Sequence, residues 1–495
     1  MSPLDAAILG LYFVTLVMLS VFGMHRYVVL YLYYRNRAGR ATAAPLPREL
    51  PRVTVQLPIY NEMYVTERLI DSATRLRYPA DRLQIQVLDD STDETASIAR
   101  AAVQHHAARG VDIQYLHRRE RAGFKAGALA AGLEQASGEF ILIFDADFVA
   151  PEDMLEKCLG HFADPRVAVV QARWGHINRD YSLLTQVQSV LLDGHFIMEH
   201  GARSRSGRFF NFNGTAGIWR RAAIDDAGGW QHDTLTEDLD LSYRAQMRGW
   251  RFVYVQDLVA PAELPVEMNA FKNQQHRWAK GSIQTCKKLL PRLLAAPLPL
   301  PIKLEAVVHL TSNLAYPLML LLSLLMFPAL VIRYNMGLYE MLIVDVPLFS
   351  GATLSVCLFY FFSQKEVFGA DWRSRLKYLP AVLSVGIGLA VNNTRAVVEA
   401  LVGRPSEFCR TPKYQVESVA DDWRHKRYRG SLGFVPFIEL ALGLYFTAMA
   451  VYAATAGIFG TLPFILIFQA GYLYAALLSL FQGLGRLRWV RTQEA

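Results

Sequence analysis

The sequence has little charge, few cysteines and neither of the common glycine-rich phosphate-binding motifs. Only 19% of its residues are charged and 52% are hydrophobic, which excludes a disordered protein and is unusual for a purely soluble one. The four cysteines lie far apart without a C-x-x-C pair, so we expect neither a disulfide framework nor a cysteine metal site. The net charge of +7 is more typical of basic cytoplasmic loops than of a nucleic-acid-binding protein.

Long apolar runs occur at both ends of the chain, and each is long enough to cross a bilayer, which takes about 20 helical residues. They are Ala6–Met24 with its extension Tyr27–Tyr34, Ala306–Ile332, Met341–Phe362, Val435–Ile458 and Leu462–Phe481. A shorter run, Leu379–Val391, has basic residues on both sides and is predicted to be interfacial. We therefore predict five spanning helices, with six as the alternative.

Basic residues follow the first apolar run and predict the orientation of the chain. Arg26, Arg35, Arg37 and Arg40 come after it, whereas the residues before it carry only Asp5. By the positive-inside rule the N-terminus lies outside and the next segment is cytoplasmic, in an inner (plasma) membrane.

Residues 52–260 alternate strand-like and helix-like patterns, which predicts an α/β fold with a mostly parallel sheet. The expected strands are Arg52–Leu57, Gln84–Leu88, Ile113–Leu116 and Phe140–Phe144, and the expected helices are Val65–Ala73, Thr95–Arg109 and Ala126–Gln135. Ligands bind beyond the carboxyl ends of such strands. Polar residues stand there, because one strand runs into Asp89 and Asp90 and another into Asp145 and Asp147. No G-x-G-x-x-G or P-loop follows the first strand, so dinucleotide and Walker-type sites are not expected.

The D-A-D segment is the strongest local signal. Asp145 and Asp147 stand where a strand ends and can share a hard divalent cation that keeps positions free for water and phosphate. A solvated turn with two acids is an equally acceptable reading of this short pattern.

Three further polar clusters allow a functional and a structural interpretation. In T-E-D (236–238) a carboxylate can act as a general base, but acids also cap the helix expected at Leu241–Met247. In Q-Q-H-R-W (274–278) Arg277 suits phosphate and Trp278 suits a sugar face, although basic and aromatic residues also form membrane-interface belts. F-C-R-T-P-K (408–413) is either a basic loop that meets anionic lipid or a flap over a phosphorylated ligand.

These motifs occur in an order that resembles the membrane-embedded family 2 glycosyltransferases of the cellulose synthase superfamily. The segments that carry the resemblance are L-P-I-Y-N-E (57–62), L-D-D-S-T-D (88–93), G-F-K-A-G-A-L (123–129), D-A-D (145–147), T-E-D (236–238), Q-Q-H-R-W (274–278) and F-C-R-T-P-K (408–413). Q-A-R-W (171–174) and F-N-F-N-G-T-A-G-I-W-R (210–220) are similar to the mannan- and glucan-synthase-like (cellulose synthase-like A/C) branches. The likeness covers roughly residues 50–415.

The resemblance implies a role for each matching residue. It places the nucleotide on Tyr60, Glu62, Asp89, Asp90, Lys125, Asp145, Gln274 and Arg277, and Mg²⁺ or Mn²⁺ on Asp145 and Asp147. Asp238 would be the catalytic base, and Trp278 with Glu237 would bind the acceptor. The family's gating loop has the form F-x-V-T-x-K. Phe408, Thr411 and Lys413 match it, whereas Arg410 replaces the valine.

The resemblance also implies a domain plan with a GT-A-type, Rossmann-like catalytic domain. The plan comprises a transmembrane helix (1–34), the cytoplasmic GT-A domain (35–281), an amphipathic interfacial helix (282–300), two transmembrane helices (301–363), an interfacial helix with the gating loop (364–432), and two transmembrane helices with a short tail (433–495).

The expected activity is an inverting, processive transfer that builds a β-linked glucan, mannan or glucomannan and moves it across the membrane. UDP-glucose and GDP-mannose are the candidate donors, with UDP-glucose slightly favoured, and the growing glycan is the acceptor. A non-processive enzyme that makes a glycolipid is the nearest alternative. A transporter that binds nucleotides without chemistry is a more distant one, because five helices without an internal repeat do not resemble a secondary transporter.

Overall fold

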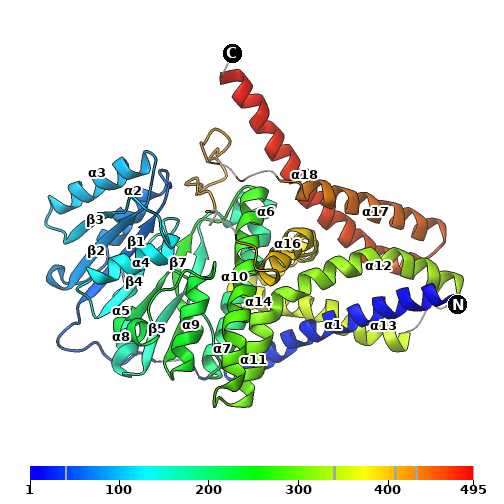
Figure 1. Cartoon of the computed structure of the whole chain (residues 1–495), viewed down its shortest axis with the longest axis horizontal. Helices are drawn as coiled ribbons and strands as arrows, with labels where there is room; N and C mark the ends of the chain where they lie inside the picture. Colours follow the sequence, from blue (N-terminus) through cyan, green and yellow to red (C-terminus); the bar gives the residue numbers. More distant parts are fainter. Residues whose placement is uncertain (40–41, 338–341, 406–409, 429, 431–432, 494–495) are drawn as a thin grey trace.

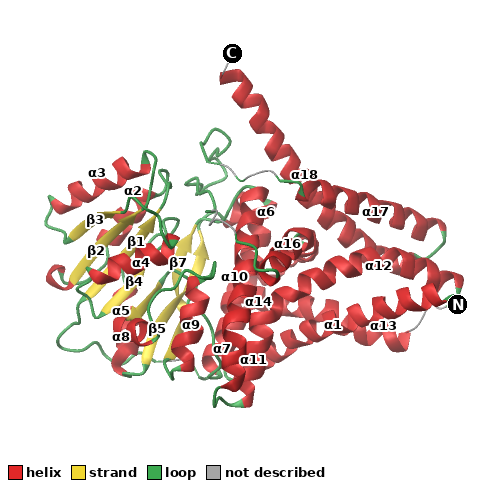
Figure 2. Cartoon of the chain, in the orientation of Figure 1, coloured by secondary structure: helices red, strands yellow, loops and turns green. Residues whose placement is uncertain are grey.

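The computed structural model describes residues 1–39, 42–337, 342–405, 410–428, 430 and 433–493, and it has two halves that lie side by side (Figure 1). One half is built around a sheet, and the other consists of long helices that include both ends of the chain (Figure 2). The predicted division into an α/β domain and a helical region is confirmed.

Within the described residues, seven strands form one mixed sheet with the order β3-β2-β1-β4-β6-β5-β7. They are β1 (Val53–Ile59), β2 (Leu83–Asp89), β3 (Ile113–His117), β4 (Phe140–Ile143), β5 (Val167–His176), β6 (Gly217–Arg220) and β7 (Arg251–Ala262). Only β6 runs antiparallel to its neighbours, β4 and β5. All seven residues of β1 and of β2 are buried, as expected for central parallel strands covered on both faces.

Helices cover both faces of the sheet. Between residues 53 and 250 the chain forms α2 (Thr66–Thr74), α3 (Thr95–Ala107), α4 (Phe124–Glu134), α5 (Met154–Cys158), α6 (Leu183–Asp193), the π-helical turn η4 (Gly194–His200), α7 (Gly201–Arg205), α8 (Arg221–Asp226) and α9 (Glu237–Met247). Of these, α6 packs instead on the helical half, against α10 (Met268–Ala295) and α15 (Leu379–Gly388). The predicted strands and helices up to β4 agree with the structure to within about two residues, which is the usual uncertainty of element ends. The strands β5, β6 and β7 were not among the predicted elements.

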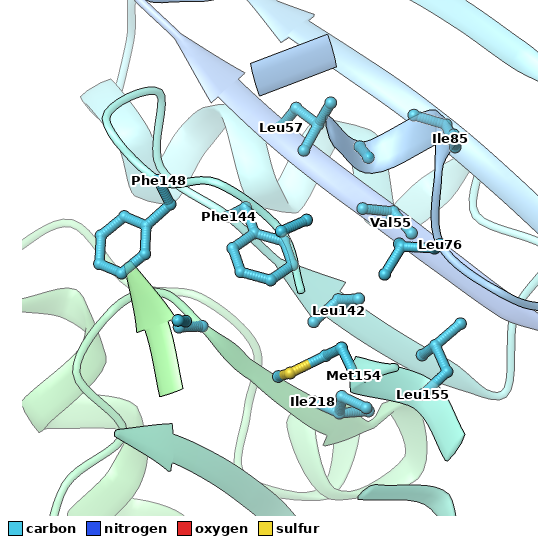
Figure 3. Close-up of a cluster of buried hydrophobic side chains, with 14 of the residues drawn as sticks. Val55, Leu57, Leu76, Ile85, Leu142, Phe144, Phe148, Met154, Leu155 and Ile218 are labelled. Carbon is cyan, nitrogen blue, oxygen red and sulfur yellow. The ribbon is translucent and has the colours of Figure 1, made fainter. Parts of the chain in front are cut away.

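One apolar cluster on the sheet holds the D-A-D turn in place. Phe144 and Phe148 lie in this cluster with Leu57 and Leu142, and both phenylalanines are almost fully buried (Figure 3). Because these two anchors flank residues 145–147, the turn that bears the two aspartates is fixed at the carboxyl edge of β4.

In the described part of the chain, five helical segments are long and apolar enough to cross a membrane. They are Pro3–Arg35, Leu300–Asn335, Val346–Gly388, Val435–Thr455 and Phe459–Gly483. The helices that contribute to these segments are α1 (Pro3–Arg35), α11 (Leu300–Thr311), α12 (Ala315–Asn335), α13 (Leu342–Phe349), α14 (Ser355–Phe368), α15 (Leu379–Gly388), α17 (Val435–Thr455) and α18 (Leu462–Gln493). Helix α16 (Ala390–Leu401) lies between the third and fourth segments. This number agrees with the five predicted spans, and that the segments cross a membrane stays a prediction. The third segment, Val346–Gly388, also includes most of the run predicted to be interfacial, and Met341, the first residue of one predicted span, lies outside the described residues.

The predicted interfacial run Leu379–Val391 forms α15 and the start of α16, and α15 packs closely on α18. A Cβ at Gly471 would lie 2.1 Å from the backbone oxygen of Ser384, and one at Gly388 would lie 2.5 Å from the oxygen of Gly471. Small residues of this kind let membrane helices approach closely. This run is therefore partly enclosed by protein.

The prediction of a separate amphipathic helix at 282–300 is wrong. Residues 282–295 are the second half of one helix, α10 (Met268–Ala295), which also carries the Q-Q-H-R-W motif. Leu289 and Leu293 are fully buried in a cluster with Leu239 and Tyr243 of α9, so protein covers this part of the apolar face, whereas Leu294 is exposed. A helical period indicates a buried face, but it does not show what buries it.

Candidate active site

A cavity opens at the carboxyl ends of β1, β2 and β4 and is closed on its other sides by α9, α10 and residues 410–413. The predicted site residues that line it are Tyr60, Glu62, Asp90, Lys125, Asp145, Asp147, Glu237, Asp238, Gln274, Arg277, Trp278, Arg410, Thr411 and Lys413. Motifs that are far apart in the sequence therefore converge in one place, while their individual roles stay predictions.

Among the described residues, one predicted site residue, Asp89, does not join this lining. Asp89 is fully buried, and its carboxylate accepts hydrogen bonds from the Tyr115 hydroxyl at 2.6 Å and the Ser91 backbone nitrogen at 3.0 Å. The carboxylate of Asp89 is therefore occupied by the protein itself, and its contact with the nucleotide stays a prediction. Phe408 lies outside the described residues.

Asp90 lines the cavity but is held by an arginine. The Arg118 guanidinium donates to both carboxylate oxygens, with distances of 2.8 and 2.6 Å. Arg118 also donates to the backbone oxygen of Phe124 at 2.9 Å, so it fixes the loop that leads into α4. Asp90 thus shapes this end of the cavity.

Each aspartate of the D-A-D turn is paired with a lysine from another motif. Lys125 donates to Asp145, and Lys413 donates to Asp147 at 2.6 Å. The Glu62 carboxyl faces both aspartates, and burial together with their negative charge raises the pKa of Glu62 to about 7. Negative and positive groups therefore alternate around the turn.

This donor set fits a hard divalent cation that takes much of its coordination from substrate. Carboxylate oxygens are the ligands that Mg²⁺ and Mn²⁺ prefer, and one or two carboxylates with phosphates and water make a common site. Among the described residues, no group of three or more His, Cys, Asp or Glu side chains is arranged as a protein-only metal site. Asp145 and Asp147 would accordingly hold such a cation jointly with a diphosphate.

Asp238 stands at the first turn of α9 on another side of the cavity. Its enclosure, together with the neighbouring Glu237 carboxylate, raises the pKa of Asp238 to about 7. A carboxyl group with such a pKa can exchange a proton near neutral pH, as a general base must. A Cβ at Gly214, whose φ is +79°, would lie 3.1 Å from Oδ2 of Asp238, so a glycine keeps the space beside the base open.

The T-E-D and Q-Q-H-R-W motifs are joined by direct packing of α9 on α10. The Leu235 backbone nitrogen donates to Oε1 of Gln284 at 3.0 Å, and Nζ of Lys288 lies 2.9 Å from the Asp240 carboxylate. Glu237 and Asp238 do lie in the first turn of a helix, as the structural interpretation required, and the same turn faces the cavity.

An aromatic wall continues from Trp278. The indole of Trp174 lies 6.5 Å from that of Trp278, and Trp174 also packs edge-on against Phe148 at 5.3 Å. Trp174 lines the cavity but was not predicted as a site residue. Its place in Q-A-R-W was a usable signal, because that segment was noted as part of the resemblance.

Residues 410–415 dock onto the cavity through Glu263, which sequence reasoning also missed. Glu263 follows β7, is only 2% exposed, and accepts hydrogen bonds from the backbone nitrogens of Tyr414 and Gln415 at 2.9 Å each. Lys413 donates to the Glu263 backbone oxygen at 2.8 Å. Arg410 packs over the Tyr428 ring at 4.0 Å and lies 3.8 Å from Glu62. Residues 410–413 of the predicted loop therefore line the cavity, and the side chains of Arg410 and Lys413 bring positive charge to its carboxylates.

The sheet is mostly parallel and has acidic turns at its carboxyl edge, which is where ligands bind in α/β domains. Comparison with known proteins identifies the kind of domain. The sequence profile of the family described as "Glycosyltransferase like family 2" matches residues 51–281. These residues form a glycosyltransferase family 2 domain, and the predicted GT-A-like fold is confirmed.

Curated relatives show which glycosyltransferases this chain is similar to. Residues of this chain are 45% identical over 249 residues to glucomannan 4-beta-mannosyltransferase 2 of Arabidopsis thaliana, a match that covers 49% of this chain and 47% of the relative. A probable glucomannan 4-beta-mannosyltransferase 6 of Oryza sativa subsp. japonica is 42% identical over 266 residues, covering 53% of this chain and 45% of the relative. The chain thus spans about half the length of the curated relatives it matches.

A solved structure shares the fold over most of the chain. It is the mannosyltransferase PcManGT from Pyrobaculum calidifontis in complex with GDP-Man and Mn²⁺, with a TM-score of 0.54 and 22% identity. The match covers 80% of this chain and 100% of the archaeal one.

Proposed function

We propose that this protein is an inverting, metal-dependent hexosyltransferase that polymerises a β-linked mannan or glucomannan from a nucleotide sugar at a membrane. The observation that supports it best is the cavity itself. Asp145 and Asp147 follow β4 and are paired with Lys125 and Lys413, whereas Asp238 comes from α9, so different groups are present for a diphosphate and for an acceptor hydroxyl.

GDP-mannose is the donor that we propose first, in place of the UDP-glucose that the sequence slightly favoured. The curated relatives are named mannosyltransferases, and the archaeal structure of the same fold holds GDP-Man and Mn²⁺. Tyr60, Glu62 and Asp90 line the end of the cavity that would receive the nucleoside.

The leaving group would be stabilised by fixed cations. As the bond between the anomeric carbon and the phosphate oxygen breaks, its electron pair leaves with the nucleoside diphosphate. Arg277 and Lys125 would neutralise this growing charge from two sides of the cavity. A divalent cation held by Asp145 and Asp147 would add Lewis-acid stabilisation of the same diphosphate.

Asp238 would act on the acceptor. It would take the proton of a sugar hydroxyl while that oxygen forms its bond to the anomeric carbon. A single displacement of this kind inverts the anomeric centre, so an α-linked donor gives a β-linked product. Trp278 and Trp174 offer flat apolar surfaces on which the terminal sugar of the acceptor would rest.

We further propose that the catalytic half is cytoplasmic, that the N-terminus lies outside, and that the helical half guides the glycan across the membrane. Support comes from the basic residues that follow the first span and from five membrane-length helices directly beside the cavity-bearing domain (Figure 1). In sealed vesicles with the donor outside, export predicts polymer inside. Polymer found only on the donor side would refute export.

The activity is tested with purified full-length protein in detergent. It is offered GDP-mannose, GDP-glucose or UDP-glucose with Mn²⁺ or Mg²⁺, and products are digested with β-1,4-mannanase or β-1,4-glucanase. The proposal expects a polymer from GDP-mannose that the mannanase degrades. A product one sugar long on a lipid would support the glycolipid alternative, and folded protein that binds nucleotide without turnover would refute an enzyme.

A further inference from the structure

Asn213 lines the candidate active site, although sequence reasoning noted only the segment 210–220 around it and gave the residue no role. It lines the cavity and is 9% exposed, in the loop just before β6. The next residue, Gly214, accepts a hydrogen bond from Lys125 at 2.9 Å, and its Cβ position is 3.1 Å from Asp238. If Lys125 faces the diphosphate and Asp238 the acceptor, Asn213 borders the space between them.

The orientation of the Asn213 amide is fixed by a buried histidine. Nε2 of His200 lies 3.1 Å from the backbone oxygen of Asn211 and 3.0 Å from Oδ1 of Asn213. A carbonyl oxygen only accepts, so Nε2 must carry the hydrogen. Nδ2 of Asn211 also donates to Oδ1 of Asn213, at 2.7 Å. Two donors therefore converge on this oxygen and prevent the amide from turning over.

Asn213 lines the cavity, and the same geometry gives its amide nitrogen no acceptor on His200. Nδ2 of Asn213 lies 3.2 Å from Nε2 of His200, but a nitrogen that carries a hydrogen in the ring plane cannot accept one. The backbone nitrogen of Asn213 is separately bound to Oε1 of Gln171 at 3.1 Å. The hydrogens of Nδ2 thus remain available for a ligand.

The residue that orients Asn213 is itself rigid. His200 is fully buried at the end of the π-helical turn η4, a type of turn that often occurs at functional sites. Burial lowers the pKa of His200 well below its ordinary value, so the ring stays neutral and keeps one hydrogen at neutral pH. A neutral donor in a fixed place is suited to selecting one hydroxyl group.

We infer that Asn213 donates a hydrogen bond from Nδ2 to a hydroxyl of the hexose being transferred, and that His200 is the positioning residue for this contact. The inference rests on the proposed function and deepens it, because it names a residue that distinguishes one hexose from another. A site built to bind a sugar hydroxyl discriminates strongly against a sugar that lacks it.

The test compares wild-type protein with Asn213→Ala, using GDP-mannose and its 2-, 3-, 4- and 6-deoxy counterparts in single-turnover release of GDP. We expect kcat/KM of the variant to fall about 10- to 100-fold with GDP-mannose, and to match wild type with one of the deoxy donors. The Kd for GDP in the presence of Mn²⁺ should not change. Asn213→Ser, which keeps an oxygen for His200, serves as a second variant should the alanine protein fail to fold.

His200 is tested by the same donor series. His200→Phe should weaken the preference between GDP-mannose and that deoxy donor, and His200→Gln, which keeps an N–H donor, should restore part of it. Gln84→Ala is the matched control, because it removes a buried amide bound to Thr54 and Ser137 outside the lining of the cavity. It should lower the unfolding temperature without changing donor preference.

Two results would overturn the inference. One is an equal loss of rate with every donor, which would make Asn213 merely structural, and the other is no loss at all. Neither outcome touches the proposed function, which fails separately if wild-type protein turns over no nucleotide sugar.

Discussion

Gly281 on α10 lies directly against Thr236, the residue before the first turn of α9. A Cβ at position 281 would be 2.5 Å from Cγ2 of Thr236 and 2.9 Å from its backbone nitrogen. The contact joins the helix that bears Arg277 and Trp278 to the turn that bears Asp238. The distance between the proposed leaving-group site and the proposed base therefore depends on the absence of one methyl group.

Replacing this glycine should separate the two motifs. Gly281→Ala forces α9 and α10 apart, and overpacking of this kind costs about 1–3 kcal/mol of folding stability. We expect kcat to fall by more than the loss of folded protein explains, because Asp238 and Arg277 no longer face the same substrate. Sugar transfer and the unfolding temperature are measured together. Gly386→Ala, where a Cβ meets nothing within 4 Å, is the control, and equal activity of the two variants would contradict the account.

Asp238→Asn should abolish transfer while leaving donor binding intact. The amide keeps the shape of the carboxylate but cannot take a proton, and general base catalysis is typically worth about 100-fold or more. Turnover and the Kd for GDP-mannose with Mn²⁺ are the two measurements. Near-normal turnover would remove Asp238 from its role.

Activity should rise with pH through neutrality. Enclosure and the Glu237 charge raise the pKa of Asp238 to about 7, and only the deprotonated form can act as the base. Below about pH 7, kcat/KM should therefore fall about tenfold per pH unit, and above it the rate should level off. Because the pKa of Glu62 is also about 7, the pH dependence of the Glu62→Gln variant is measured as well. Its kcat/KM should show the same fall below pH 7, the acidic limb of the profile. Loss of the limb in Glu62→Gln would assign it to Glu62 instead.

A buried ion pair connects α10 to the membrane helices. Lys272 donates to Glu439 of α17 and to the Ser479 hydroxyl of α18 at 2.8 Å, and both charged residues are almost fully buried. Glu439→Leu should cost about 3–5 kcal/mol, because it leaves a buried ammonium unpaired. The double variant Lys272→Met/Glu439→Leu should recover most of this loss in thermal unfolding in detergent. No destabilisation by the single variant would show that the pair is not needed to hold α10.

Three of the parallel strands were predictable because they are buried. Strands β1, β2 and β4 are covered on both faces, so each appears as a short apolar run in the sequence. Strand β6 begins with a glycine and ends with an arginine, and β5 and β7 carry exposed or half-exposed polar positions, so their pattern is weaker. The amphipathic half of α10 had a clear pattern, but that pattern is the same whether lipid or α9 covers it.

Some residues of the candidate site could be predicted from the sequence and others could not. Residues in ordered motifs, such as Asp145 and Arg277, were found because a motif fixes their place in the chain. Trp174, Asn213 and Glu263 were missed because their importance depends on where β5, β6 and β7 bring them. Asp89 stands beside Asp90 in the same motif, but only the structure shows that Tyr115 occupies its carboxylate.

The most direct test is a structure of the Asp238→Asn variant with GDP-mannose and Mn²⁺. The account predicts an anomalous manganese signal between the diphosphate and the carboxylates of Asp145 and Asp147, with Lys413 displaced from Asp147 or bound to phosphate. The anomeric carbon should lie between Arg277 and residue 238, beside Asn213. Manganese or nucleotide bound elsewhere in the protein would contradict the central claim that these motifs form one transferase site.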